Sequence, residues 1–176
     1  MVLSDTDIQS AVKRGDIIIR GFDPKRLQPA SYDLLLGNKF IFNNDYLTDF
    51  IDPGKKVYAK PRTVELKDSE KLILHPGVSV LGISHDYFGS HRYLIQLSGK
   101  SSLARIGLIV HNTAGIVNPG HFLNITLELY NLNSVPIILR PKMPIAQIIF
   151  SQLSSPPSQS YREIGRYNNG GLHSWV

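Results

Sequence analysis

Short apolar runs separated by turn residues are the feature of this sequence that most restricts its fold. Turn signals such as Asp52-Pro53-Gly54, Pro76-Gly77 and Asn118-Pro119-Gly120 recur between runs that are too short for ordinary helices. Many short strands joined by such turns are typical of an all-β sandwich or barrel. We therefore predict strands over residues 17–19, 40–42, 56–59, 63–66, 71–74, 78–83, 93–97, 108–110, 122–130, 136–139 and 145–153.

One short helix is expected at the N-terminus. Ser4 can cap it, Asp7 stands where the reciprocal residue of a capping box belongs, and Ile8 and Ala11 fall on one face. Gly15 then ends the helical pattern, because glycine readily adopts the backbone conformation that closes a helix.

The length of 176 residues fits a single domain, and 42% hydrophobic residues suffice for a core that needs neither disulfide nor metal. The chain has no cysteine, which excludes a disulfide framework, a thiolate zinc site and a cysteine nucleophile. Neither a signal peptide nor an apolar run of about 20 residues is found, so a cytoplasmic protein is expected. The net charge of +5 favours anionic partners, although the basic residues are scattered.

The segment 98–107 carries the strongest signal for anion binding. Gly99 frees the backbone after an apolar run, and Lys100 and Arg105 add positive charge around a serine pair. It is not a P-loop, because Leu94 stands where that motif requires a glycine. The local sequence is equally compatible with an ordinary strand-to-helix turn that is capped by Ser101.

Glu128 is the candidate catalytic group. Alternation along its strand places Leu127 and Leu129 on one face and Thr126 and Glu128 on the other. A solvent-facing Glu128 would mean little, whereas a carboxylate in a cleft could be held ionised by Arg105 and could deprotonate water. No His-x-x-x-His spacing accompanies it, and no histidine metal centre is expected.

Taken together, these segments resemble the dCTP deaminase branch of the dUTPase superfamily. Lys100 stands where that family usually has arginine. The matching segments follow one another in the family's order: residues 3–8, 28–37, 99–105, 113–120, 126–128 and 144–147.

The resemblance implies a distorted jelly-roll β-barrel, formed by a single domain over residues 1–176 and assembled as a homotrimer. Active sites would lie between subunits, and a mobile tail over residues 154–176 would close them. The reaction would be zinc-independent hydrolysis of dCTP to dUTP and ammonia, with Mg²⁺ carried by the triphosphate, and it would supply dUTP for dUMP and dTTP synthesis. Apart from the nucleotide and its own copies, no partner is implied, neither nucleic acid nor membrane.

The resemblance also implies a role for each site residue. Glu128 would take a proton from the water that attacks C4 of cytosine, Ser101 and the carbonyl of Ala114 would hold that water, and Arg105 would keep Glu128 ionised. The remaining contacts to substrate would come from these residues: Lys100, Ser101 and Ser102 on the triphosphate, Leu103 and Ala104 beside them, Asn118 on the sugar, Thr126 and Leu127 on the base, and Tyr161 and Arg166 from the tail.

Asn118 bears on whether the enzyme would stop at dUTP or go on to cleave it. The family usually has aspartate there, and an amide cannot serve as the carboxylate base for a second, phosphate-cleaving reaction. A dUTP-forming deaminase is therefore the main expectation, and a bifunctional enzyme that releases dUMP and pyrophosphate, or a dUTPase, is the alternative. An inactive nucleotide-binding protein is more remote, because both Arg105 and Glu128 are retained.

Overall fold

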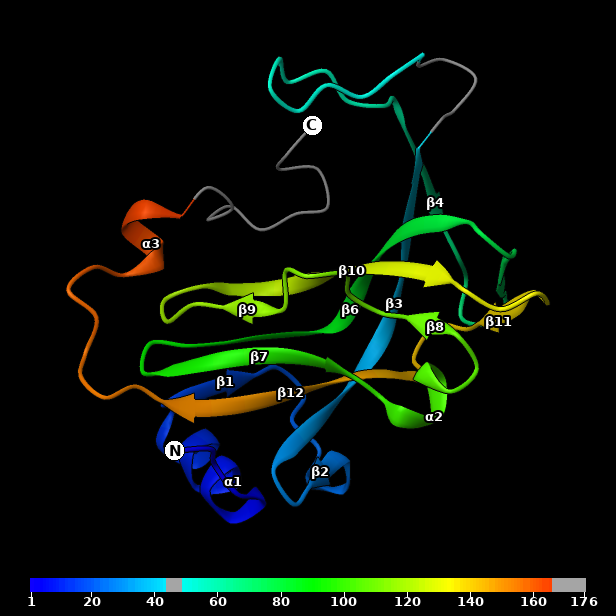
Figure 1. Ribbon diagram of the computed structural model, residues 1–176. Helices are drawn as coiled ribbons and strands as arrows, with labels where there is room; N and C mark the ends of the chain where they lie inside the picture. Colours follow the sequence, from blue (N-terminus) through cyan, green and yellow to red (C-terminus); the bar gives the residue numbers. More distant parts are fainter. Residues whose placement is uncertain (44–48, 166–176) are drawn as a thin grey trace.

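The computed structural model describes residues 1–43 and 49–165. Within these residues, ten strands form one curled antiparallel sheet, with the path β8-β10-β6-β3-β12-β7-β9 and with β1, β2 and β4 at its side (Figure 1). Strands β5 and β11 form a separate ribbon. The strands are β1 (Ile17–Ile19), β2 (Leu27–Gln28), β3 (Ser31–Asn43), β4 (Pro61–Glu65), β5 (Leu72–Leu74), β6 (Ser79–Ser90), β7 (Tyr93–Gly99), β8 (Leu108–Ile109), β9 (Ile116–Val117), β10 (Phe122–Asn131), β11 (Ile137–Leu139) and β12 (Pro144–Gln152). The helical elements are α1 (Asp5–Arg14), η1 (Pro24–Arg26), α2 (Ser101–Ala104) and α3 (Tyr161–Ile164).

Helix α1 forms as predicted. The side chain of Ser4 accepts a hydrogen bond from the backbone N–H of Asp7, and the Asp7 carboxylate accepts one from the backbone N–H of Ser4. Gly15 closes the helix with a φ of 79°, in the left-handed region that glycine tolerates best. Ile8 and Ala11 are fully buried, so the predicted apolar face anchors the helix to the sheet.

Strand β3 is far longer than the predicted stretch 40–42. It pairs with β12 in its first part and with β6 and β4 further along. Consecutive residues from Ser31 to Leu34 are all buried, so this part shows no alternation of apolar and polar residues. A strand covered on both faces lacks the period-two signal, which explains why the sequence revealed only its end.

Strand β6 also continues past its predicted end, and the predicted strand over residues 56–59 is wrong. Asp86 lies inside β6, where it is buried and paired with Arg26, a contact that local sequence cannot reveal. Around residue 56 the chain forms a turn and not a strand. The Asp52 carboxylate accepts from the backbone N–H of Lys55, and Lys56 adopts a φ of 57°.

Strand β10 positions the candidate catalytic carboxylate. Ile125, Leu127 and Leu129 are buried in the core, whereas Thr126 and Glu128 are half-buried on the opposite face. The predicted alternation is therefore confirmed. None of the helices among the described residues is both long and apolar enough to span a membrane.

Candidate active site

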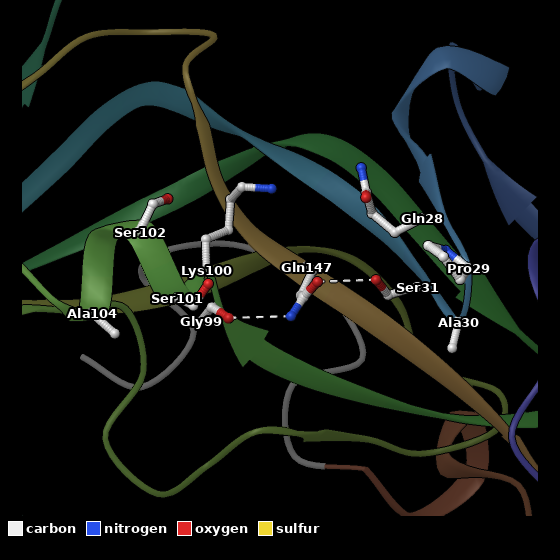
Figure 2. Close-up of a pocket in the computed structure, with 10 residues that line it drawn as sticks. All are labelled: Gln28, Pro29, Ala30, Ser31, Gly99, Lys100, Ser101, Ser102, Ala104 and Gln147. Carbon is white, nitrogen blue, oxygen red and sulfur yellow. Dashed lines mark hydrogen bonds between the residues drawn. The ribbon is translucent and has the colours of Figure 1, made fainter.

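A pocket of about 660 Å³ lies where three distant segments of the chain meet (Figure 2). One wall is the turn between β2 and β3, the other is the end of β7 with α2, and Gln147 of β12 lies between them. Of the described residues that line it, Lys100 alone carries a charge. The lining consists of Gln28, Pro29, Ala30, Ser31, Gly99, Lys100, Ser101, Ser102, Ala104 and Gln147.

The segment predicted to bind phosphate forms one wall of this pocket. Lys100 keeps an extended backbone as the N-cap residue of α2, and no side chain caps the helix. The alternative interpretation, a turn capped by Ser101, is therefore wrong in its cap, because Ser101 is already the first residue of the helix. Ser101 and Ser102 are both exposed, so their hydroxyl groups can meet a ligand.

Gln147 joins the two walls. Its Oε1 accepts a hydrogen bond from Ser31 Oγ at 3.0 Å, and its Nε2 donates to the carbonyl of Gly99 at 3.2 Å (Figure 2). The sequence alone predicts no site role for Ser31 or Gln147. The available signal was a single amide in the otherwise apolar run 145–150.

Lys100 is held by a carboxylate at the edge of the pocket. Its Nζ lies 2.6 Å from Asp33 Oδ1, in an ion pair whose angle falls outside regular hydrogen-bond geometry. The other oxygen, Asp33 Oδ2, accepts a long hydrogen bond of 3.4 Å from Gln28 Nε2. Asp33 and Gln147 both lie in segments that match the family, but the sequence alone predicts no role for either.

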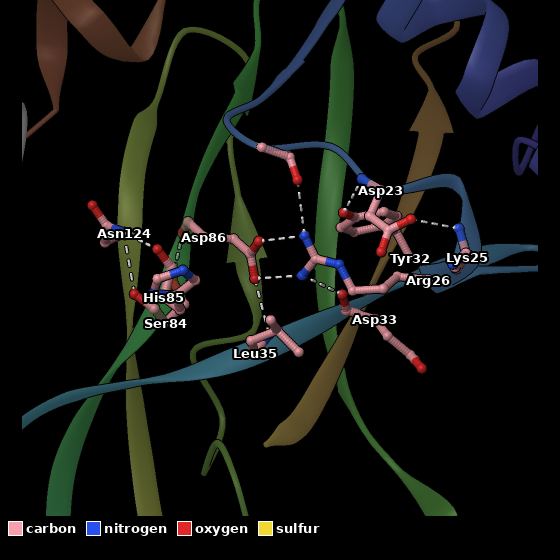
Figure 3. A network of polar contacts seen from close by, with 11 residues as sticks. Asp23, Lys25, Arg26, Tyr32, Asp33, Leu35, Ser84, His85, Asp86 and Asn124 are labelled. Carbon is pink, nitrogen blue, oxygen red and sulfur yellow. Dashed lines mark hydrogen bonds and ion pairs between the residues drawn. The ribbon is translucent and has the colours of Figure 1, made fainter. Parts of the chain in front are cut away.

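A second ion pair fixes the backbone of this corner (Figure 3). Both terminal nitrogens of Arg26 donate to Asp86, at 2.8 and 3.0 Å, and Asp86 also accepts from the backbone N–H of Leu35. Arg26 further donates to the carbonyl of Asp33 and lies over the ring of Tyr32. The start of β3 is therefore clamped to β6.

Burial and the charge of Asp86 act on Arg26 in opposite directions. Burial lowers the pKa of Arg26, but the hydrogen bonds to Asp86 and its negative charge outweigh this effect and leave the pKa raised. Burial also raises the pKa of Tyr32, whose hydroxyl accepts a hydrogen bond from the backbone N–H of Asp23. Arg26 thus stays charged and Tyr32 neutral at physiological pH.

Glu128 lies outside the pocket, against the loop that follows β8. Its Oε2 accepts a hydrogen bond of 2.7 Å from the backbone N–H of Asn112. Its own N–H donates to the carbonyl of Val110. Glu128 is consequently a half-buried, oriented carboxylate and not a freely solvated side chain.

Arg105 does not reach Glu128 within the chain. It is exposed at the end of α2, and no ion pair joins it to another of the described residues. Ala114 is exposed on the loop beside Glu128, and the next carbonyl, of Gly115, accepts from the N–H of Leu97. The single chain therefore does not assemble the predicted group of Ser101, Arg105 and Glu128.

Asn118 and Tyr161 lie together in a third location. The backbone N–H of Tyr161 donates to the carbonyl of Pro119, next to Asn118. The ring of Tyr161 stacks on His121 with 4.1 Å between ring centroids. The start of the tail is thereby docked on the turn that carries Asn118, whereas Arg166 lies outside the described residues.

The family model for dCTP deaminase-like proteins matches residues 2–153. The chain belongs to the dCTP deaminase family. The predicted enzyme class, a hydrolase of the dCTP deaminase type, is confirmed.

Curated members of the dCTP deaminase family resemble the chain over most of its length. A protein of Tropheryma whipplei named "dCTP deaminase, dUMP-forming" is 44% identical over 92% of this chain and 83% of its own length. A protein of Corynebacterium kroppenstedtii with the same name is 42% identical over 92% of this chain and 87% of its own length.

A solved structure of a family member supports the fold. The crystal structure of 2′-deoxycytidine 5′-triphosphate deaminase from Agrobacterium tumefaciens superposes with a TM-score of 0.65, at 18% sequence identity. The match covers 86% of this chain but only 48% of that one, so the chain spans about half its length. The predicted dUTPase-like β-fold with a short N-terminal helix is confirmed.

The donor atoms of the pocket suit a nucleotide that brings its own magnesium. Of the described residues, no three His, Cys, Asp or Glu side chains gather as a metal cluster, and the pocket lining contains no carboxylate. Magnesium prefers phosphate oxygens and water to a dedicated protein cage. The hydroxyl groups of Ser101 and Ser102 and the ammonium group of Lys100 fit the phosphates of such a complex.

Proposed function

We propose that the protein deaminates dCTP by hydrolysis and then releases dUMP and pyrophosphate. The orientation of the Glu128 carboxylate by a backbone N–H supports the deamination step. The names of relatives at 42% and 44% identity support dUMP as the product. This conclusion favours the alternative over the dUTP-forming reaction expected from Asn118, whose exposed amide can still bind a sugar hydroxyl.

Glu128 is the proposed general base. A hydrogen bond from Asn112 N–H to its Oε2 fixes the direction of the carboxylate. Glu128 takes a proton from water while the oxygen attacks C4 of cytosine. The same carboxyl group then passes the proton on towards N3 and the leaving amine, so water and dCTP give dUTP and ammonia. A second water then cleaves dUTP to dUMP and pyrophosphate.

The phosphates are proposed to occupy the pocket beside α2. Lys100 supplies positive charge, and Ser101 and Ser102 supply hydroxyl donors. When magnesium is bound with the nucleotide, it neutralises part of the phosphate charge. Thr126 and Leu127 are proposed to contact the base, and Tyr161 with Arg166 to approach from the tail.

A homotrimer with active sites between subunits is part of this proposal. Glu128, Arg105 and Asn118 do not line the pocket that holds Lys100, although one substrate must meet all of them. Contact between two copies would bring the pocket of one chain to the Glu128 face of the next. The same contact would supply Arg105 with a carboxylate partner.

The first experiment is a product assay with dCTP and Mg²⁺ that follows ammonia, dUTP, dUMP and pyrophosphate together. We expect ammonia, dUMP and pyrophosphate in equal amounts. Ammonia with accumulating dUTP would instead identify a dUTP-forming deaminase in which Asn118 blocks the second step. Cleavage of dUTP without ammonia release from dCTP would contradict the deaminase proposal.

Replacing the general base tests the mechanism. Glu128→Gln should lower kcat for ammonia release by at least about 100-fold, because the amide cannot accept a proton from water. Nucleotide binding, measured by calorimetry, should survive. Glu65→Gln is the matched control, since Glu65 is exposed and makes a surface pair with Lys39 and a long hydrogen bond with Asn38, away from the pocket. Unchanged turnover in Glu128→Gln would remove Glu128 from its proposed role.

A further inference from the structure

The charge of Lys100 is already balanced before any phosphate arrives. Its Nζ lies 2.6 Å from Asp33 Oδ1, and the two side chains are 23% and 12% exposed. Charges at this distance and depth interact more strongly than a fully solvated pair, because less water screens them. An anion that enters the pocket therefore meets a cation that already has a counterion.

The backbone that carries Asp33 is fixed, whereas the ammonium group of Lys100 is adjustable. Arg26 donates to the Asp33 carbonyl and is itself held by both oxygens of Asp86, which fixes the backbone of Asp33. Lys100 reaches Asp33 through a single contact at the end of a flexible stem. Lys100 can thus turn from Asp33 towards a ligand, while Asp33 stays within reach of the ammonium group and competes with that ligand for it.

We propose that Asp33 is a counterion that weakens the binding of polyphosphates to Lys100 and so speeds the release of polyphosphate products. This inference rests on the proposed function, because it takes Lys100 to face the phosphates. Asp33 acts through Lys100 and is a positioning residue. Its carboxylate competes for the ammonium group in the free protein and recaptures it as a product leaves.

The direction of a binding change tests this role. In Asp33→Asn, the affinities for inorganic tripolyphosphate and for pyrophosphate, measured by calorimetry with and without Mg²⁺, should rise about tenfold. Steady-state kinetics should show a lower KM for dCTP and stronger inhibition by pyrophosphate, with no rise in kcat. Asp68→Asn is the matched control, since Asp68 pairs with Lys142 on the surface and lies outside the pocket lining.

The same substitution made in a Lys100→Met protein shows whether Asp33 acts through Lys100. The gain from Asp33→Asn should vanish when Lys100 is replaced by methionine, since the carboxylate then has no cation to occupy. Unchanged or weaker polyphosphate binding in Asp33→Asn would overturn the inference, as would a gain that persists alongside Lys100→Met. If Asp33→Asn does not fold, Asp33→Ser provides the same test.

The inference and the proposed function fail in different ways. Tripolyphosphate binding is measured without turnover, so it tests the counterion even if the protein releases no ammonia from dCTP. Absence of ammonia release from the unaltered protein would contradict the proposed function alone. If the unaltered protein binds dCTP but neither tripolyphosphate nor pyrophosphate, the inferred counterion role of Asp33 is overturned and the proposed function is not.

Discussion

Two ion pairs meet at the start of β3, and they differ in how completely their charges are satisfied. In the Arg26–Asp86 pair, two parallel hydrogen bonds join the side chains, and a backbone N–H completes the carboxylate. In the Lys100–Asp33 pair, one contact joins them, and only a long hydrogen bond from Gln28 meets the other oxygen. The number of partners on each charge distinguishes a pair that holds the fold from one that is available to a ligand.

Burial follows the same division. The Arg26 and Asp86 side chains are 15% and 1% exposed, so neither charge can recover its hydration if the other is removed. Lys100 lines an open pocket and can turn into the water there. The two pairs should therefore respond very differently to the loss of one carboxylate.

The largest effect is expected from Asp86→Ala. Removing this carboxylate leaves Arg26 buried and unpaired and should lower the free energy of unfolding by about 3–5 kcal/mol. Urea denaturation measures the loss. Asp68→Ala is the control, and it should cost about 1 kcal/mol or less because its pair with Lys142 is on the surface. Equal losses in both variants would show that the Arg26–Asp86 pair does not hold the fold.

An intermediate effect is expected from Arg26→Lys. The charge remains, but an ammonium group cannot make the paired contacts of the guanidinium fork, so the free energy of unfolding should fall by about 1–3 kcal/mol. Thermal unfolding of the variant beside the unaltered protein measures this difference. An unchanged stability would mean that the charge of Arg26 is enough to hold the Arg26–Asp86 pair, and that the number of hydrogen bonds does not matter.

The smallest effect on stability is expected from Asp33→Asn. Lys100 can be hydrated in the pocket, so the free energy of unfolding should fall by about 1 kcal/mol or less. The same urea titration applies, and its result is read beside the polyphosphate affinity of this variant. A loss as large as that of Asp86→Ala would abolish the distinction between the two pairs.

Local features of the sequence were enough to predict much of the fold. The cap residues Ser4 and Gly15 predicted helix α1, and alternation around Glu128 predicted the faces of β10. Sequence reasoning failed where burial removed the alternation, as in the first part of β3. It also failed at Asp86, because a polar residue inside a strand is explained only by Arg26, 60 positions away.

The residues of the candidate site also fall into those that the local sequence predicts and those that it does not. The contiguous segment from Lys100 to Ser102 was predicted to bind phosphate, and it does line a pocket. The roles of Ser31, Asp33 and Gln147 were missed because each depends on a partner from a distant segment. The pairing of Arg105 with Glu128 stays a prediction, since a single chain does not form it.

The amide of Gln147 has a consequence for how the pocket can change over generations. Because the oxygen and the nitrogen of one amide group bond to opposite walls, the spacing of these walls depends on a single residue. Substitution there could alter the fit of a nucleotide while every phosphate-contacting residue stayed the same. The position is thus a place where substrate preference can drift without loss of the reaction.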